Sequence, residues 1–97
     1  MLYTIKYSSI TSNSFDSLLR IIPKGSPILF YEDGVLNAVD GSRDQEKVSD
    51  ALKDHPVFAL DADLEARGIK KVISGIQVIS YDGFVELVEE HDVAPWL

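Results

Sequence analysis

Short apolar runs alternate along this chain with stretches of helical periodicity, and this alternation limits the fold more than any other feature. The runs are rich in residues that favour β-strands, and polar or glycine-containing segments separate them. The expected strands are residues 2–7, 28–31, 57–60 and 76–79. Strands that alternate with helices are joined by right-handed crossovers and form a mostly parallel sheet. The sequence therefore predicts an α/β fold, a single three-layer domain over residues 1–97 with a mostly parallel sheet of four to five strands.

Helix signals fill the segments between these runs. An apolar stripe at helical spacing and several capping residues place the expected helices at about residues 15–22, 34–39, 42–55, 61–68 and 80–88. The candidate N-caps are Asn13 or Ser14, then Asp33, Ser42 with Gln45 as its capping-box partner, and Ser80. Residues 72–73 are either a short extra strand or a loop. Residues 94–97 are expected to close the chain as a tail.

The chain is acidic and contains no cysteine. Among its 97 residues, 16 are Asp or Glu and 9 are Lys or Arg, which gives a formal net charge of −7. Such a surface repels phosphate groups, so we expect neither direct nucleic-acid binding nor attachment to an anionic membrane. Without cysteine, no disulfide or cysteine nucleophile can form. No signal peptide is recognisable, and no apolar run approaches the roughly 18 residues of a membrane helix, so we expect a cytoplasmic protein.

Two carboxylates follow the expected strand at residues 28–31, where parallel sheets often place catalytic groups. Glu32 and Asp33 there would suit a metal or a phosphoacceptor only if a neighbouring strand also ended in acidic residues. The first strand instead ends in Tyr7-Ser8-Ser9, and the loop after it lacks the glycines of a phosphate loop. The sequence thus favours a structural turn, in which Asp33 caps a helix and Gly34 permits the sharp corner.

Two histidines could act as catalytic groups or metal ligands. His55 precedes a proline at a helix end and is expected at the surface. His91 lies in an acidic, solvated helix end, where it is the one nitrogen ligand nearby. We therefore expect no metal site, no cofactor and no catalytic residue in this chain.

Several stretches resemble the DsrH/TusB family, in matching order and spacing over nearly the whole length. No one of these stretches is specific by itself, and their joint arrangement carries the resemblance. They are residues 1–4, 13–17, 32–35, 59–68, 81–85 and 96–97.

The resemblance implies a small parallel α/β subunit of the DsrE/DsrF/DsrH type. Such a subunit joins TusC/TusD-like (DsrF/DsrE-like) chains in a hetero-hexamer, which relays persulfide sulfur for 2-thiolation of the wobble uridine in tRNA. An alternative is the DsrH branch, in which the related complex serves dissimilatory sulfur oxidation. An alternative of another class is a stand-alone phosphate- or metal-dependent enzyme or signalling domain.

The resemblance also identifies what this chain lacks. The family cysteine positions match Leu18 and His91, and neither residue is a thiol. A persulfide needs a thiolate, so the chain is expected to be a non-catalytic subunit. Its interface with partners is expected to use exposed apolar residues, with Tyr81, Phe84 and Trp96 as candidates. For Trp96 the alternative is a buried anchor for the C-terminal tail.

Overall fold

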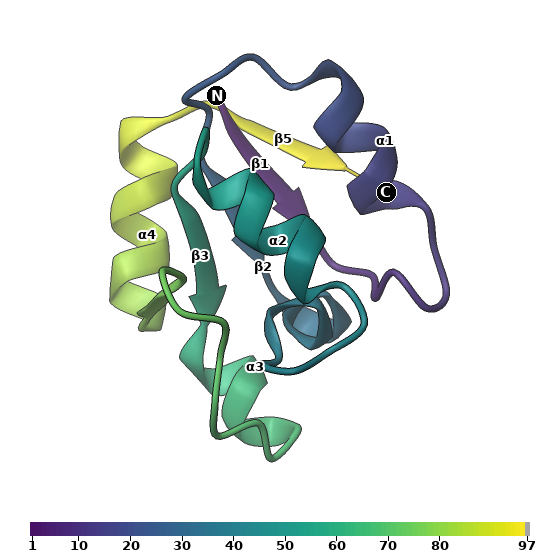
Figure 1. Ribbon diagram of the computed structural model, residues 1–97. Helices are drawn as coiled ribbons and strands as arrows, with labels where there is room; N and C mark the ends of the chain where they lie inside the picture. The colour runs from purple at the N-terminus through teal and green to yellow at the C-terminus, as the bar shows by residue number, and fades with distance from the viewer. Residues whose placement is uncertain (97) are drawn as a thin grey trace.

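The computed structural model describes residues 1–96 and contains one sheet of five parallel strands in the order β4-β3-β2-β1-β5 (Figure 1). All four neighbouring pairs are parallel. The strands are β1 (Leu2–Ile5), β2 (Ile28–Phe30), β3 (Val57–Leu60), β4 (Gln77–Ile79) and β5 (Val93–Trp96). The predicted α/β class with a parallel sheet is confirmed.

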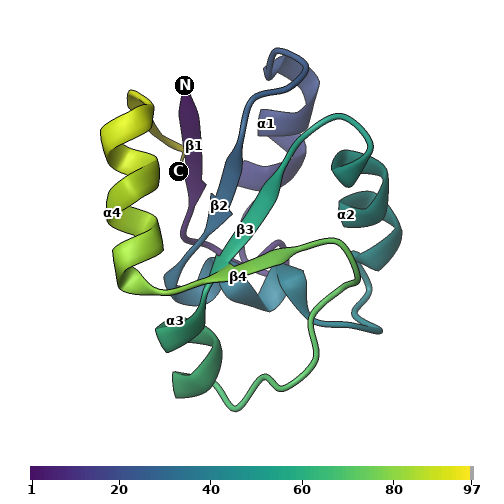
Figure 2. The ribbon, with the colours of Figure 1, turned by 90° about the vertical axis from the view of Figure 1, so that its left-hand side faces the viewer.

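Helices cover both faces of this sheet unequally. They are α1 (Ser14–Ile21), the 3₁₀ helix η1 (Glu32–Ala38), α2 (Gln45–Leu52), α3 (Asp61–Ala66) and α4 (Tyr81–Glu90). Within residues 1–96, helices α1 and α2 lie on one face and α4 is the one helix on the other, while η1 and α3 lie at the carboxyl ends of the strands (Figures 1 and 2). The longest described helix, α4, has 10 residues, and none in residues 1–96 is long and apolar enough to cross a membrane.

The main core lies between the sheet and helices α1 and α2. The stripe predicted for α1 is confirmed, because Phe15 and Leu18 are fully buried and Leu19 and Ile22 pack against the same cluster. The ring of Phe15 meets that of Phe30 edge-on, with centroids 5.2 Å apart. Burying one such side chain stabilises the fold by roughly 1.5–3 kcal/mol. This layer therefore holds α1 firmly on the sheet.

The predicted C-terminal tail is wrong, because residues 93–96 form strand β5 at an edge of the sheet. Val93 pairs with Leu2 and Trp96 with Ile5. Pro95 cannot donate to a strand ladder, so a strand that contains it is tolerated only at an edge. Trp96 is half-buried and packs against the core cluster. Residues 93–96 thus complete the sheet beside β1, and Leu97 of the predicted tail lies outside the described residues.

Residues 72–73, for which the sequence left a strand or a loop open, do not join the sheet. Val72 makes an isolated antiparallel bridge with Val39, and Ile73 is buried in the core. This short bridge ties the segment after α3 to the end of η1. The same segment passes Gly68, whose φ of 67° ends the α3 region as the sequence predicted.

Of the predicted N-cap residues, only Ser80 of α4 makes a side-chain capping bond: its hydroxyl accepts the Gly83 N–H at 3.2 Å. Asn13 is the N-cap residue of α1, yet its side chain makes no capping bond. Helix α2 begins at Gln45 rather than after Ser42. The Gln45 amide oxygen accepts the N–H of Gly41, so the expected reciprocal box with Ser42 does not form.

Gly34 allows η1 to begin directly against the end of β1. The Tyr31 N–H donates to the Ile5 carbonyl at 3.1 Å, and Gly34 lies beside the same carbonyl. A Cβ atom on Gly34 would stand 2.0 Å from the Ile5 oxygen and 2.8 Å from the Ile5 carbonyl carbon. The requirement for glycine is therefore close backbone contact, which no side chain permits.

Replacing Gly34 by alanine tests this contact. Because backbone atoms of β1 block the new methyl group, Gly34→Ala should lower the free energy of unfolding by about 3 kcal/mol or more. Gly41→Ala is the control: its φ is 81°, but no atom lies within 4 Å of the position that a Cβ atom would occupy, so it should cost about 1 kcal/mol. Urea unfolding measures both, and equal losses in the two variants would contradict the proposed backbone contact.

Candidate functional site

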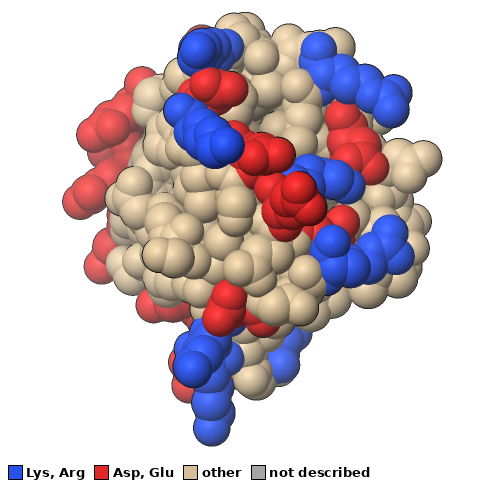
Figure 3. Space-filling view, viewed as in Figure 1, with Lys and Arg blue, Asp and Glu red and all other residues tan. Residues whose placement is uncertain are grey.

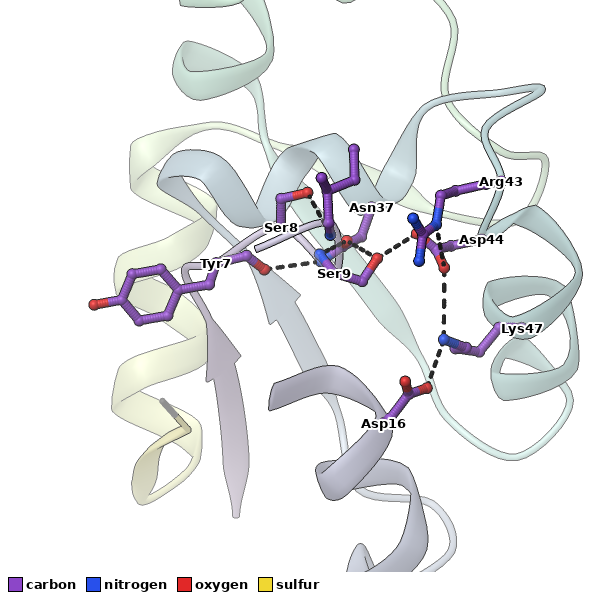
Figure 4. A network of polar contacts seen from close by, with 9 residues as sticks. Tyr7, Ser8, Ser9, Asp16, Asn37, Arg43, Asp44 and Lys47 are labelled. Atoms are coloured by element: carbon purple, nitrogen blue, oxygen red, sulfur yellow. Dashed lines mark hydrogen bonds and ion pairs between the residues drawn. The ribbon is translucent and has the colours of Figure 1, made fainter. Parts of the chain in front are cut away.

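The carboxyl ends of β1, β2 and β3 form the end of the sheet at which ligands usually bind. This end is called the sheet edge, as distinct from the edge strands β4 and β5. In this protein the edge is occupied by the loop after β1, by η1 and by α3. Two groups of polar side chains lie there. The first joins the β1 loop to η1 and α2, and the second joins the start of η1 to α3 (Figure 4 shows the first).

Asn37 is the centre of the first group, and it is only 1% exposed. Its amide oxygen accepts the Ser9 N–H at 2.9 Å, and its amide nitrogen donates to the Tyr7 carbonyl at 3.2 Å. These two bonds fix the orientation of the amide, since a flipped amide would face both partners with the wrong group. Asn37 thereby makes the hydrogen bonds that a neighbouring strand would otherwise make to the backbone after β1.

The Ser9 hydroxyl extends this group to α2. It donates to a carboxylate oxygen of Asp44 and also lies 3.0 Å from the Asn37 amide oxygen. A hydroxyl has one proton, and a carboxylate is the stronger acceptor, so Asp44 receives it. Asp44 is 7% exposed. Although Asp44 is the N-cap residue of α2, its carboxylate makes no capping bond, because Ser9 and neighbouring cations engage it.

Lys47 connects the group to α1. Its ammonium lies 2.5 Å from a carboxylate oxygen of Asp16 and 3.5 Å from one of Asp44. The hydrogen bond to Asp16 is the main reason that the pKa of Lys47 is raised above its ordinary value of 10.5, with the charges of both carboxylates adding to it and partial desolvation opposing it. Arg43 approaches Asp44 at 3.9 Å. The carboxylates here are thus engaged by the protein itself.

The second group corrects the role predicted for Asp33. Asp33 does not cap a helix: Tyr31 is the N-cap residue of η1, and no side chain caps it. Asp33 instead accepts two hydrogen bonds from Arg67, the C-cap residue of α3, at 2.8 and 3.1 Å. Because Asp33 is 63% exposed, this pair contributes no more than about 1 kcal/mol. Asp33 therefore links two elements at the sheet edge.

Glu32 has an unusual backbone conformation beside this pair. Its φ is 49°, the left-handed region that residues other than glycine seldom adopt. The Glu32 N–H donates to the Asp63 carboxylate at 2.7 Å, which compensates for part of the strain. Asp63 of α3 therefore stabilises the corner between β2 and η1, and Gly34 provides the close contact between this corner and β1.

These groups give the edge a structural role. A serine nucleophile needs a base oriented by a third group, and in residues 1–96 neither histidine supplies one near Ser9. His55 lies 3.0 Å from the Ser26 carbonyl, and it is buried, which corrects the surface position expected for it. His91 ends α4 on the other side of the sheet. Nor do three His, Asp or Glu side chains of the described chain gather as metal ligands.

A cavity of about 310 Å³ lies between α3, the segment after it and β4. Its walls are mostly apolar, with charged side chains at the rim. The lining residues are Asp61, Leu64, Glu65, Gly68, Ile69, Lys70, Val72 and Val78. None of its charged groups belongs to either polar group at the sheet edge, so it adds no chemistry to them.

The positions matched to family cysteines are not brought together. Leu18 is fully buried in α1, whereas His91 follows α4 on the opposite face of the sheet (Figure 2). The three candidate interface residues also differ in setting. Tyr81 is 65% exposed, Phe84 is half-buried with its ring centroid 5.8 Å from that of Tyr81, and Trp96 packs on the core.

Known sequences similar to this chain identify its family. Residues 7–94 match the family described as DsrH like protein. Protein TusB of Escherichia coli (strain K12) is 41% identical over 93 residues, which cover 94% of each chain. Protein TusB of Serratia proteamaculans (strain 568) is 42% identical over 94 residues, with the same coverage.

The chain belongs to the DsrH/TusB family. Solved structures agree on its fold: the ychN protein from E. coli superposes with a TM-score of 0.81 at 16% identity, covering 97% of this chain and 96% of the other. The protein of unknown function MTH1491 from Methanobacterium thermoautotrophicum gives 0.71 at 17% identity, with the same coverage. At such identities these likenesses support the fold alone.

Ser9, Asn37 and Asp44 of this DsrH/TusB chain carry no motif that would single them out from the sequence. The one local signal is a polar Asn37 within the otherwise apolar residues 35–39. A buried polar residue requires partners, but those of Asn37 lie 28 and 30 positions away. Only the folded topology brings them together.

Asn37→Ala should lower the free energy of unfolding by about 2 kcal/mol or more, because it leaves the Ser9 N–H and the Tyr7 carbonyl without their partner. Asn13→Ala is the matched control, since the Asn13 side chain makes no capping bond, and it should change stability by less than about 0.5 kcal/mol. Urea unfolding measures both. A loss at Asn13 as large as that at Asn37 would contradict this assignment.

The link through Lys47 predicts a pH dependence. A raised pKa in the folded state means that the contribution of Lys47 is complete below its ordinary value of 10.5 and is lost as pH rises through the higher folded value. Lys47→Met should cost about 1 kcal/mol at neutral pH, and the difference from the unmodified chain should shrink above pH 10.5. Lys53→Met, at an exposed pair, is the control. A difference that grows with pH would refute the assignment.

Proposed function

We propose that this chain is a non-catalytic subunit of a persulfide-relay complex that carries out 2-thiolation of the wobble uridine in tRNA. The observation that carries the proposal is its 41–42% identity to proteins named TusB over 94% of both chains. Family membership supports a role in sulfur relay, as the resemblance of the sequence implied. The chain has no cysteine, so the persulfide is borne by another subunit.

The features of the sheet edge support a non-catalytic role. The Ser9 hydroxyl, the Asn37 amide and the Asp44 carboxylate are engaged with one another and with the backbone. Leu18, at a position matched to a family cysteine, is fully buried in the core. The positions where a related chain could carry catalytic groups are thus used here for packing and hydrogen bonding.

The partners in this proposal are TusC/TusD-like (DsrF/DsrE-like) subunits, joined with this chain in a hetero-hexamer. The net charge of −7 opposes direct contact with tRNA, so the partners supply the tRNA-facing surface as well as the thiolate. The function of this chain is then to complete the assembly and hold the catalytic subunit in its active arrangement.

Deleting the gene tests the proposal. Mass spectrometry of nucleosides from total tRNA should show loss of 2-thiouridine derivatives at the wobble position, and the unmodified gene should restore them. Unchanged thiolation would refute the proposal. A thiolation level that stays unchanged while sulfur oxidation fails would favour the DsrH-branch alternative.

The distribution of sulfur within the complex gives a second readout. After incubation of the purified complex with a persulfide donor, intact-mass measurement should show added sulfur on a partner chain and none on this one. A stable gain of one sulfur atom by this chain, or a specific activity of the isolated chain on a phosphorylated substrate, would contradict the non-catalytic role.

A further inference from the structure

Helix α4 is apolar on two adjoining sides. Its less exposed apolar residues, Phe84 and Leu87, are three positions apart and lie on the side that faces the sheet. A second stripe contains Tyr81, Val85 and Val88, at spacings of four and three residues, which again places them on one face. These three side chains are 65%, 40% and 39% exposed. This second, outer stripe lies between the residues that face the sheet and the acidic side formed by Glu86, Glu89 and Glu90, so it widens the apolar surface of α4.

The covering of this sheet face is also incomplete. Helix α4 is the one helix on it within residues 1–96, and no residue of α4 is buried (Figure 2). On the opposite face α1 and α2 both contain buried residues. Val93 of β5 is in register with Leu2, which is buried but lies outside the core cluster beneath α1 and α2, and Val93 is 39% exposed. Val93 thus adds exposed apolar surface at the edge strand β5.

The charged side chains of α4 and of the residues that follow it are all acidic. From residue 72 to the end the sequence contains no Lys or Arg. The acidic residues in this part are Asp82, Glu86, Glu89, Glu90 and Asp92. In the part of the chain that the structure describes, none of them is in an ion pair, whereas acidic residues of α1, α2 and α3 are paired with Lys or Arg. Acidic side chains accordingly line the side of the molecule where α4 lies (Figure 3).

We propose that the outer face of α4, made of Tyr81, Val85 and Val88 with its acidic border, docks a partner subunit whose own surface presents an apolar strip bordered by Lys and Arg. This inference rests on the proposed function, because the partner is taken to be a subunit of the relay complex. An apolar centre with a charged border is the usual composition of a specific protein interface.

Charge decides between this partner and a second copy of the chain. A symmetric dimer through α4 would place Glu86, Glu89 and Glu90 of one copy against the acidic border of the other. Like charges facing one another across an interface oppose association. A basic border on the partner removes that repulsion and speeds the encounter of the two proteins.

Within this surface the side chains have different roles. Tyr81 offers the largest exposed area, and tyrosine is among the residues that most often dominate binding energy. Val85 and Val88 extend the apolar contact along the helix. The carboxylates remain at the border, where they affect the association rate and its salt dependence more than the final affinity.

The test titrates the purified chain against its TusC/TusD-like partners by calorimetry. Tyr81→Ala with Val88→Ala should weaken binding at least tenfold. Ile10→Ala with Ile21→Ala is the matched control, since those residues are 69% and 62% exposed in the β1 loop and on α1, and it should leave the affinity unchanged. Because all four side chains are exposed, thermal unfolding should confirm that each variant is folded.

Charge variants give an independent readout. Glu86→Gln with Glu89→Gln and Glu90→Gln should slow association and reduce its dependence on salt concentration. Glu46→Gln with Glu65→Gln, on α2 and α3, should change neither. Stopped-flow measurements at low and high salt distinguish these outcomes.

Several results would overturn the inference. Equal affinities for the α4 double variant and its control would do so, as would a dimer of the isolated chain that the α4 variants dissociate. If thiolation requires the chain and the complex forms, yet the α4 variants bind normally, only the docking surface is wrong. If the unmodified chain forms no complex and tRNA thiolation survives its deletion, both proposals fail.

Discussion

The close contact between Gly34 and the Ile5 carbonyl determines what the rest of the sheet edge can be. It allows η1 to cross the end of β1 at a distance that no side chain would permit. Asn37, one turn further along η1, is thereby brought to the backbone of Tyr7 and Ser9. Ser9 in turn reaches Asp44, and Lys47 connects that carboxylate to α1. One close backbone contact, between Gly34 and Ile5, therefore positions the polar side chains that join the β1 loop, η1, α2 and α1.

The functional consequence is that the usual ligand-binding edge of a parallel sheet is used here for structure. Its hydroxyl, amide and carboxylate groups have partners within the protein, and Arg67 and Asp63 hold the corner after β2 from α3. The groups that remain free to contact other molecules lie on the outer surface of the helices. The two faces of the sheet differ in this respect, since α1 and α2 have buried residues whereas α4 has an exposed apolar side with unpaired carboxylates within the described residues 1–96. A subunit that acts through contact rather than chemistry fits this distribution.

Local patterns were sufficient to predict the parallel sheet, the stripe of α1 and the Ser80 cap, because each depends on residues close together in the sequence. The errors share a different cause. Asp33 was expected to cap a helix, but its partner Arg67 is 34 positions away. Residues 94–97 were expected to form a tail, but residues 93–96 form a strand, and only the edge position beside β1 makes a strand with proline acceptable. Asn37 has no local motif because its role is defined by two distant backbone groups.

Hydrogen–deuterium exchange of the chain, free and in complex with its relay partners, tests the central claim most directly. If the sheet edge is structural and α4 is the docking surface, complex formation should slow exchange in residues 81–93 and leave residues 7–11 and 32–38 unchanged. Slower exchange at the sheet edge, with α4 unaffected, would show that partners bind where the structure places only internal contacts, and would contradict the account.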